Sequence, residues 1–388
     1  PTQVRLSPQA WLHKNLFSTW YNSLLTLVVF SILFRVLFGL AAWAKTQAQW
    51  DVIPQNLPLF LVGLYPSDQR WRIWLILGLI TLLSGLSWGI AARNARIWTK
   101  GVLIGIGVVG MAAVLMPVAV PSKRWLLGAI ALFIGGTAIG QIVGKRLPAL
   151  GKWLSFSWFT TFFISLWLLG GGLGLSSVST NNWGGLTLTL FTAVASIVLC
   201  FPIGVLLALG RRSTLPVIRW LCTIYIEAIR GVPLISILFM GQVMIPMFLP
   251  EGVRPDRVLR AIIGLTLFSA AYLAENVRGG LQAIPRGQTE AAQALGLNTP
   301  LTLGLIVLPQ ALKISIPAIV GQFISLFQDT TLLSIVGLVE LLGMSNSVLA
   351  NPLFLGRYSE VYLFNGVLFW FFCYSMSIAA RRLERSLN

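Results

Sequence analysis

The side chains that could do chemistry are few in this chain of 388 residues. Asp and Glu together number 11, and His13 is the only histidine, so neither a histidine relay nor a multi-histidine metal site can form. The phosphate-binding pattern G-x-x-x-x-G-K-[ST] is absent, because the nearest stretch, Gly135 to Gly140, is followed by Gln141 instead of lysine. Carboxylates paired at catalytic spacing are absent as well. We therefore expect a chain that is not an enzyme, binds no ATP itself and carries no cofactor or metal.

The composition is typical of a membrane protein. Apolar residues make up 56% of the chain and charged residues 10%, and the mean hydropathy is +0.82. Apolar runs of about twenty residues, enough for a helix to cross a bilayer, recur along the whole length. The net charge of +17 would indicate nucleic acid in a soluble protein, but here the basic residues cluster between apolar runs, as the positive-inside rule expects. The sequence predicts an all-α polytopic membrane protein with no nucleic-acid partner.

We expect about ten transmembrane helices, with both termini cytoplasmic. The expected spans are 21–44, 73–91, 101–120, 125–143, 153–175, 186–209, 234–249, 259–284, 315–339 and 361–380. This arrangement leaves about two thirds of the basic residues in cytoplasmic segments, which is the bias that the positive-inside rule requires. After the first span, the apolar stretch Leu57–Leu64 is expected to touch the membrane interface.

A small, polar and glycine-rich stretch, SSVSTNNWGG at 176–185, predicts a boundary between two units. We expect an N-terminal membrane extension of about five spans at 1–175. Residues 176–388 form the second unit, also with about five spans.

One stretch between two expected spans, residues 285–309, is too polar to lie in lipid. Its alanine-rich part, Gln288 to Leu295, favours a short helix, and Gly296 is placed to end that helix in a left-handed cap. The alanines leave a smooth face that another protein could approach closely. Taken alone, such a stretch is also typical of an ordinary loop helix.

The spacing within this stretch resembles the cytoplasmic coupling loop of permease subunits of bacterial ATP-binding-cassette importers: Glu-Ala-Ala, three residues, Gly, nine residues, Ile-x-Leu-Pro. Residues 225–234 (YIEAIRGVPL), 274–285 (AENVRGGLQAIP), 308–312 (LPQAL) and 328–332 (QDTTL) resemble the polar amino acid importers. Residues 11–20 and 63–72 resemble the long subfamily of general or neutral amino acid permeases. The ATPase-coupling residues that the resemblance implies are Glu290, Ala291, Ala292, Gly296, Leu308 and Pro309.

This resemblance implies the transmembrane permease subunit of an ATP-driven amino acid importer in the bacterial plasma (inner) membrane, with the last five spans forming the importer permease core. The implied partners are cytoplasmic ABC ATPase subunits that bind the ATP, a periplasmic or extracellular solute-binding protein and a second permease subunit. Because long members of the family usually pair with a different sibling, we expect a heterodimer. The substrate is an amino acid, and membrane lipid surrounds the spans.

Polar side chains expected within the membrane are candidates for the translocation path. Asp329 lies about fourteen residues into the span 315–339, or about 20 Å along the helix and beyond the midplane. Since a carboxylate is costly there, Asp329 either lines the path or pairs with a charge, for instance an arginine of a partner subunit. Gln322, seven residues earlier, shares its helix face. Gln328 stands where related permeases often have lysine, so any substrate contact inferred from that lysine is in doubt here.

Two further candidates, Glu275 and Asn276, lie near the inner end of the span 259–284. They are expected either to line the inner gate or to form a polar cluster that fixes helix packing. Glu227 and Arg230, three residues apart at a helix end, are expected to form an ion pair.

A self-contained, ion-coupled secondary amino acid carrier is the alternative function. Such carriers need polar relays through several spans, and often inverted repeats with broken helices. The spans between residues 73 and 175 carry almost no ionisable groups, and the halves show no convincing repeat. The importer is therefore the favoured interpretation.

Overall fold

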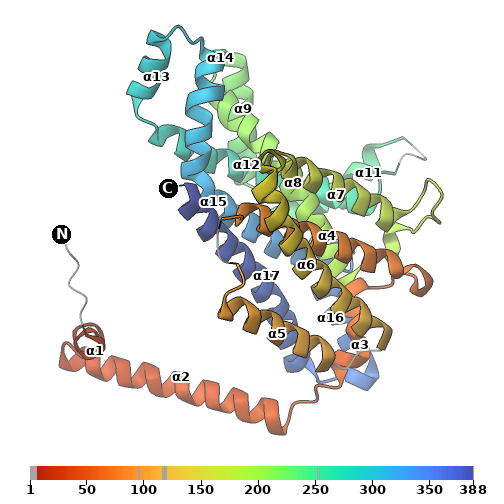
Figure 1. The fold of residues 1–388 in the computed structure, drawn as a ribbon. Coiled ribbons are helices and arrows are strands. Elements are labelled where there is room, and N and C mark those ends of the chain that lie inside the picture. Colours follow the sequence, from red (N-terminus) through yellow and green to blue (C-terminus); the bar gives the residue numbers. More distant parts are fainter. Residues whose placement is uncertain (1–6, 95–96, 116–119, 251, 253, 388) are drawn as a thin grey trace.

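The computed structural model describes residues 7–94, 97–115, 120–250, 252 and 254–387, and every regular element in these residues is helical (Figure 1), which confirms the all-α class. The elements of the N-terminal part are α1 (Pro8–Leu16), α2 (Trp20–Thr46), α3 (Val52–Val62), η1 (Ser67–Gln69), α4 (Trp71–Ala91), α5 (Lys100–Leu115), α6 (Val120–Arg146), η2 (Pro148–Trp153), α7 (Leu154–Gly170) and η3 (Thr180–Asn182).

The C-terminal part continues with long helices joined by short ones. Its elements are α8 (Gly185–Arg211), α9 (Pro216–Arg230), α10 (Leu234–Phe239), the π-helix η4 (Met240–Met244), α11 (Ile245–Phe248), α12 (Arg257–Ala283), α13 (Arg286–Ala294), α14 (Thr299–Leu301), the π-helix η5 (Thr302–Val307), α15 (Leu308–Asp329), η6 (Thr330–Ser334), α16 (Leu341–Leu349), η7 (Pro352–Phe354) and α17 (Tyr358–Leu387).

Eight helices in the described part of the chain are long and apolar enough to cross a membrane. The pair formed by α9 and the α10–α11 segment is bent by 103° and makes a ninth where the two are counted as one broken span. The helix α5 is shorter and stands in the place of the third expected span, whose end falls at residues 116–119, outside the described residues. The polytopic architecture is thus the expected one, with α5 the element that falls short of full span length.

The expected span 315–339 is wrong at both ends. The helical segment begins at Thr299, and the α-helix ends at Asp329, where the chain tightens into η6. Proline ordinarily interrupts a helix because it has no N–H, but here the π-helix η5 accommodates Pro309, and Leu308 donates its N–H to the Leu303 carbonyl. Asp329 is therefore the last residue of α15, and not a residue in the middle of a span.

The stretch expected at the membrane interface forms the second half of α3, which packs against the protein with one face. Val52 and Phe60 are fully buried, in a cluster with Leu341 of α16 and Val361 of α17. The rings of Phe60 and Phe364 lie 5.3 Å apart. A short apolar helix has the same composition in lipid and in a protein core, so only the packing partners, including the unexpected α16, decide its place.

The N-terminal part meets the rest of the chain where three glycines allow close backbone contact. A Cβ on Gly63 would lie 2.5 Å from the Gly184 Cα, and the next residue, Gly185, donates its N–H to the Val339 carbonyl at 3.1 Å. Gly63 and Gly185 have φ of +61° and +58°, a conformation that glycine adopts without strain. The end of α3, the start of α8 and the segment before α16 thus converge at one point.

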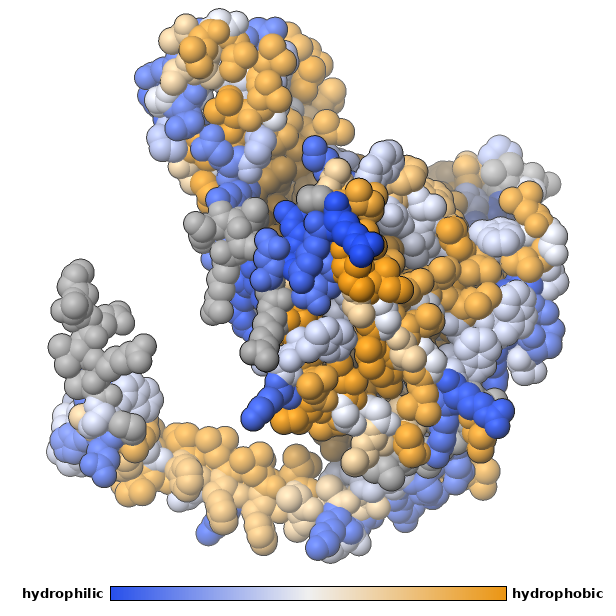
Figure 2. Space-filling view, viewed as in Figure 1, coloured by the Kyte–Doolittle hydropathy of each residue, from blue (hydrophilic) through white to orange (hydrophobic). Residues whose placement is uncertain are grey.

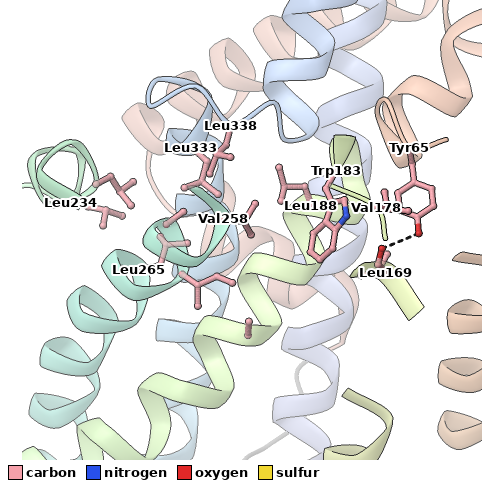
Figure 3. Packing of buried hydrophobic residues seen from close by; sticks show 14 residues of the cluster. Tyr65, Leu169, Val178, Trp183, Leu188, Leu234, Val258, Leu265, Leu333 and Leu338 are labelled. Carbon is pink, nitrogen blue, oxygen red and sulfur yellow. Dashed lines mark hydrogen bonds between the residues drawn. The ribbon is translucent and has the colours of Figure 1, made fainter. Parts of the chain in front are cut away.

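Buried side chains extend this junction into the core, as Figure 3 shows. The Tyr65 hydroxyl donates to the Leu169 carbonyl at 3.0 Å, beside Trp183 and Leu188. Arg72, only 1% exposed, donates to both the carbonyl and the hydroxyl of Ser176. These bonds tie the start of α4 to the segment after α7.

The helices α4 and α6 pack closely through glycines spaced four residues apart. A Cβ on Gly89 of α4 would lie 2.3 Å from the Thr137 carbonyl oxygen, and one on Gly140 of α6 would lie 2.5 Å from that of Leu86. Small residues at this spacing let membrane helices approach until their backbones touch. This pair forms the centre of the N-terminal part.

Figure 1 shows α13 and α14 at one end of the molecule and α3 and α16 at the other. It also shows α2 extending away from the bundle, and none of the residues of α2 is buried. The coupling loop expected at 285–309 therefore projects from one end of a bundle whose two parts are joined at the opposite end.

Candidate coupling helix and translocation path

The short helix expected around Glu290 is α13, and its C-terminal cap is a Schellman motif. Gly296 has φ of +81°, its N–H donates to the Gln293 carbonyl, and the Leu297 N–H donates to the Ala292 carbonyl. A residue with a Cβ would be strained in this conformation, although there is open space around Gly296. The structure thus confirms the left-handed cap that the sequence predicts.

The side chains of α13 divide between a covered and an open side. Ala292 is buried, whereas Glu290, Ala291 and Gly296 are exposed, and Leu295 is 83% exposed. The exposed Leu295, together with the small residues Ala291 and Gly296, forms a smooth and partly apolar surface that suits contact with another protein.

One hydrogen bond connects α13 to the beginning of α15. The Gln310 amide donates to the Gln288 side chain at 3.3 Å and to the Ile306 carbonyl at 2.8 Å. Leu308 and Pro309 lie in the first turn of α15, directly after the π-helix η5. A displacement of α13 would therefore act on the end of the long α15 segment at its irregular turn.

Glu275 is at the centre of an ion cluster that joins three helices. Its carboxylate pairs with Arg211 of α8 at 3.2 Å, with Arg230 of α9 at 3.7 Å and with Arg278 of α12 itself. The Arg230 guanidinium also lies 5.5 Å from the centre of the Tyr272 ring. These side chains are about three-quarters buried, so the cluster holds the C-terminal parts of α8, α9 and α12 together.

The expected ion pair between Glu227 and Arg230 is wrong. Glu227 pairs instead with Arg211 at 2.8 Å, while Arg230 turns toward Glu275. Spacing along one helix allowed the local pair, but the neighbouring α8 and α12 offered each residue a partner from another element.

Asn276, the second candidate at this end, fastens α12 to α15. Its side-chain amide donates to the Ala318 carbonyl at 3.3 Å, and its main-chain carbonyl accepts from the Ser315 hydroxyl at 3.1 Å. A Cβ on the nearby Gly280 would lie 2.0 Å from the Ser315 Oγ, so the two helices touch here. Both Glu275 and Asn276 therefore make interhelical contacts of the kind that fix packing.

The three candidates on α15 have different surroundings. Gln328 is exposed and donates to the Cys373 sulfur of α17 at 3.7 Å. Gln322 and Asp329 are half-buried, and the Asp329 carboxylate has no ion-pair partner among the described residues. An unpaired carboxylate at the end of a helix also faces the negative end of the helix dipole, so its position is costly by itself.

Sequence reasoning missed a polar contact around the π-helix η4. Gln242, 8% exposed, donates to the Arg257 carbonyl and accepts through its own carbonyl from the Arg260 guanidinium. Pro246 was the sequence signal for the π-helix, because a proline disturbs the regular helix before it. In the structure Ile245 donates its N–H five residues back to the Met240 carbonyl. The π-helix thus presents its backbone to the first turn of α12.

Glu340 is a second residue that the sequence analysis missed. Its fully buried carboxylate caps α16 and accepts from the N–H groups of Leu342 at 2.7 Å and Gly343 at 2.8 Å. Burial raises the pKa of Glu340 to about 7, although those N–H groups and Thr189 lower it in part. In the sequence, Glu340 directly precedes the apolar residues Leu341 and Leu342, and this position gave no sign that the carboxylate is buried.

Among the described residues, no group of three or more His, Cys, Asp or Glu side chains is placed to hold a metal ion.

The family model of the "binding-protein-dependent transport system inner membrane component" matches residues 201–388. The chain is 38% identical to the inner membrane amino-acid ABC transporter permease protein YhdY of Escherichia coli, over 97% of this chain and 92% of that protein. It is 36% identical to the glutamate/glutamine/aspartate/asparagine transport system permease protein BztC of Rhodobacter capsulatus, over 97% of this chain and 93% of that protein.

A crystal structure of an amino acid ABC transporter with histidines is 26% identical. The match covers 60% of this chain and 98% of that one, with a TM-score of 0.47.

Proposed function

Because the chain belongs to the family of amino-acid ABC transporter permeases, we propose that it forms the membrane path of an ATP-driven amino acid importer and receives the motion of the ATPase through α13. The chain is an integral membrane protein with several membrane-spanning helices. Permeases of this family work with ATPase and substrate-binding partners. The observation that carries the coupling role is α13 itself, a capped helix that projects beyond the spans and exposes Glu290, Ala291 and Leu295.

In this proposal, α13 docks on a cytoplasmic ATPase subunit, which binds the ATP. The Schellman cap at Gly296 fixes the end of α13. The Gln288–Gln310 hydrogen bond and the π-helix before Pro309 carry the displacement into α15, and the Glu275 cluster carries it into α8 and α9. ATP and the solute-binding protein drive the change only as far as each binds one state of the permease more tightly than the other.

The proposed path runs along the face of α15 that carries Gln322 and Asp329. The absence of an ion-pair partner for Asp329 within the described chain supports this role. An ion pair with an arginine of the second permease subunit is the structural alternative. Because Gln328 replaces a cation found in related permeases and bonds Cys373 of α17, we assign Gln328 no substrate contact.

We further propose that the second permease subunit is a different chain, that the complex lies in the bacterial inner membrane and that both termini are cytoplasmic. The last of these follows from the distribution of basic residues. The substrate is proposed to be an amino acid, since the names of both relatives describe amino acid transport.

Reconstitution tests this function. The chain is co-expressed with candidate ATPase, sibling and binding-protein subunits, and the uptake of labelled amino acids into proteoliposomes is measured with and without ATP. We expect uptake to require ATP, and Gly296→Asp to abolish both uptake and ATPase stimulation while the complex still assembles.

Gly356→Asp is the matched control, because Gly356 also has positive φ, +88°, and open space around it, but is distant from α13 in sequence. It is expected to transport normally. Uptake by this chain alone, without ATP and indifferent to Gly296, would instead establish the ion-coupled carrier.

A further inference from the structure

The N-terminal part of the chain has a long segment with no negative side chain. No Asp or Glu occurs at residues 69–175, whereas Lys and Arg recur from Arg70 to Lys152. The basic residues in this segment therefore have no carboxylate of their own segment to pair with. In the Glu275 cluster, by contrast, each arginine has a carboxylate as its partner.

Several of these basic residues meet at one end of the N-terminal part. The start of α4 and the segment after α7 are tied together by the Arg72–Ser176 bonds at the end where α3 meets α8. The end of α4, the end of α6 and the start of α7 consequently lie at the opposite end. Figure 2 shows hydrophilic residues gathered on the molecular face where these elements meet.

A hollow of about 660 Å³ opens there, and both polar and apolar residues line it. Its polar lining includes Arg93 and Asn94, which directly follow α4, and its apolar lining includes Ile90 of α4 and Leu154, the first residue of α7. A charged headgroup and the first carbons of an acyl chain need this combination of surfaces.

Close packing at two glycines, one of which, Gly151, lines the hollow, holds α6 and η2 against the end of α4. A Cβ on Gly144 of α6 would lie 3.3 Å from the Arg93 Cβ and 3.0 Å from the Ile90 Cα. A Cβ on Gly151 of η2 would lie 3.7 Å from the Ile90 side chain. The basic residues that immediately follow these glycines, Lys145 and Lys152, are thereby held next to the segment that carries Arg93.

The side chains of this basic group are available for a ligand. Lys145, Arg146 and Lys152 are exposed and Arg93 is half-buried, and none of the four has an ion-pair partner within the described part of the chain. Trp153, next to Lys152, is 61% exposed. Tryptophan beside lysine is typical of the level of lipid headgroups at the membrane surface.

We propose that this hollow is a binding site for the phosphate headgroup of an anionic phospholipid, held by Arg93, Lys145 and Lys152. Because no carboxylate of their own segment neutralises these three side chains, their positive charge is free to attract the phosphate. Ile90 and Leu154 contact the glycerol and the upper acyl chain. Basic pockets between transmembrane helices recognise anionic headgroups in this way, and the site would anchor the N-terminal part in the cytoplasmic leaflet.

The test measures lipid binding to the full-length chain, purified in detergent, by native mass spectrometry during titration with phosphatidylglycerol or phosphatidylcholine. We expect tighter binding of phosphatidylglycerol. The double variant Arg93→Gln/Lys152→Gln should weaken it about thirtyfold, since each basic residue near an anionic headgroup contributes about fivefold, and should leave phosphatidylcholine unchanged.

The matched control is Lys123→Gln/Arg124→Gln, which removes the same charge near the opposite end of α6. It should bind phosphatidylglycerol as the native chain does. If Arg93→Gln/Lys152→Gln does not fold, Lys145→Gln/Lys152→Gln, which changes only exposed side chains, should show the same selective loss.

Three results would overturn the proposal. The first is unchanged phosphatidylglycerol binding in the folded site variant, and the second is an equal loss in the control pair. The third is displacement of the lipid by inorganic phosphate at equal concentration, which would assign the hollow to free phosphate. Any of these results would leave the proposed coupling role of α13 unaffected, because that role rests on other residues.

Discussion

At the scale of single residues, two carboxylates on neighbouring helices illustrate how surroundings determine role. Glu275 is surrounded by Arg211, Arg230 and Arg278, so its charge is compensated several times over. Asp329 has no such partner within the described residues and lies at the end of α15. Compensated charge stabilises an arrangement of helices, whereas an uncompensated carboxylate is costly, so we expect Asp329 to contact a group outside the chain.

Replacing Glu275 with glutamine should destabilise the chain by about 1–3 kcal/mol, because the three arginines would lose a charged acceptor in a mostly buried place. Thermal unfolding of the purified chain in detergent measures the effect. Glu290→Gln is the control, since Glu290 is exposed, and its Tm should not change. Equal Tm values for both variants would contradict the structural role of the cluster.

Glu340 makes the stability depend on pH. Its pKa is raised to about 7 from the ordinary 4.5, so the folded chain holds this proton more tightly than the unfolded chain does. The contribution of the protonated Glu340 is therefore fully present below about pH 4.5 and is lost as the pH rises through about 7. We expect the Tm of the native chain to fall between about pH 4.5 and about pH 7, relative to Glu340→Gln, which has no proton to lose. Parallel Tm curves for the two proteins would show that Glu340 does not titrate in this range.

At the scale of elements, the same irregularity occurs twice. The π-helices η4 and η5 each contain one glycine and each end two residues before a proline, Pro246 or Pro309. In both, the N–H of the residue before the proline donates five residues back, because the proline itself cannot donate. The wider turn lets a long helix continue past a proline and leaves a point where its two parts can change their relative direction.

The variant Pro309→Ala tests whether this irregular turn transmits motion. Restoring the N–H should favour a regular α-helix and reduce ATP-driven uptake by about twofold to thirtyfold, the range of coupling changes from single residues. Uptake and ATPase rates in proteoliposomes provide the measurement. Pro317→Ala is the control, because Pro317 lies inside the regular α15 with no π-helix before it. A similar loss in the two variants would indicate a general effect of proline removal.

At the scale of the whole molecule, the chain is joined at one end and has α13, the proposed coupling helix, at the other (Figure 1). The glycine contact of Gly63 with Gly184 brings the N-terminal part against the start of α8. The ion cluster around Glu275 and the helix α13 lie toward the opposite end (Figure 1). A molecule joined in this way can change the separation of its helices at the α13 end while the glycine junction stays fixed.

Gly63→Ala should open this junction, because a Cβ there would lie 2.5 Å from the Gly184 Cα and would also face an unfavourable positive φ. We expect a loss of about 1–3 kcal/mol and faster proteolysis between residues 171 and 182. Gly39→Ala on α2 is the control, since nothing lies within 4 Å of its Cβ position. Unchanged proteolysis in Gly63→Ala would mean that the junction tolerates separation.

Much of the local structure could be predicted from the residues. Lengths of apolar sequence located the long helices to within a few residues, as for α4, α8 and α12, because a helix in lipid must satisfy its own backbone. The helix α13 and its cap were predicted for a similar reason, since Gly296 directly follows the alanine-rich residues and glycine adopts the left-handed conformation without strain. The division at residue 176 stays a prediction.

The sequence by itself determined the class of the molecule, the positions of long helices such as α4, α8 and α12, and the short helix α13, because these depend on local composition and backbone conformation. Only the tertiary structure decided that α3 packs against α16 and α17, that Glu227 pairs with Arg211 and that Glu340 is buried. Each of these depends on a partner far away in the sequence. The free energy of burial or pairing is set by which surfaces meet, and neither periodicity nor spacing along one segment contains that information.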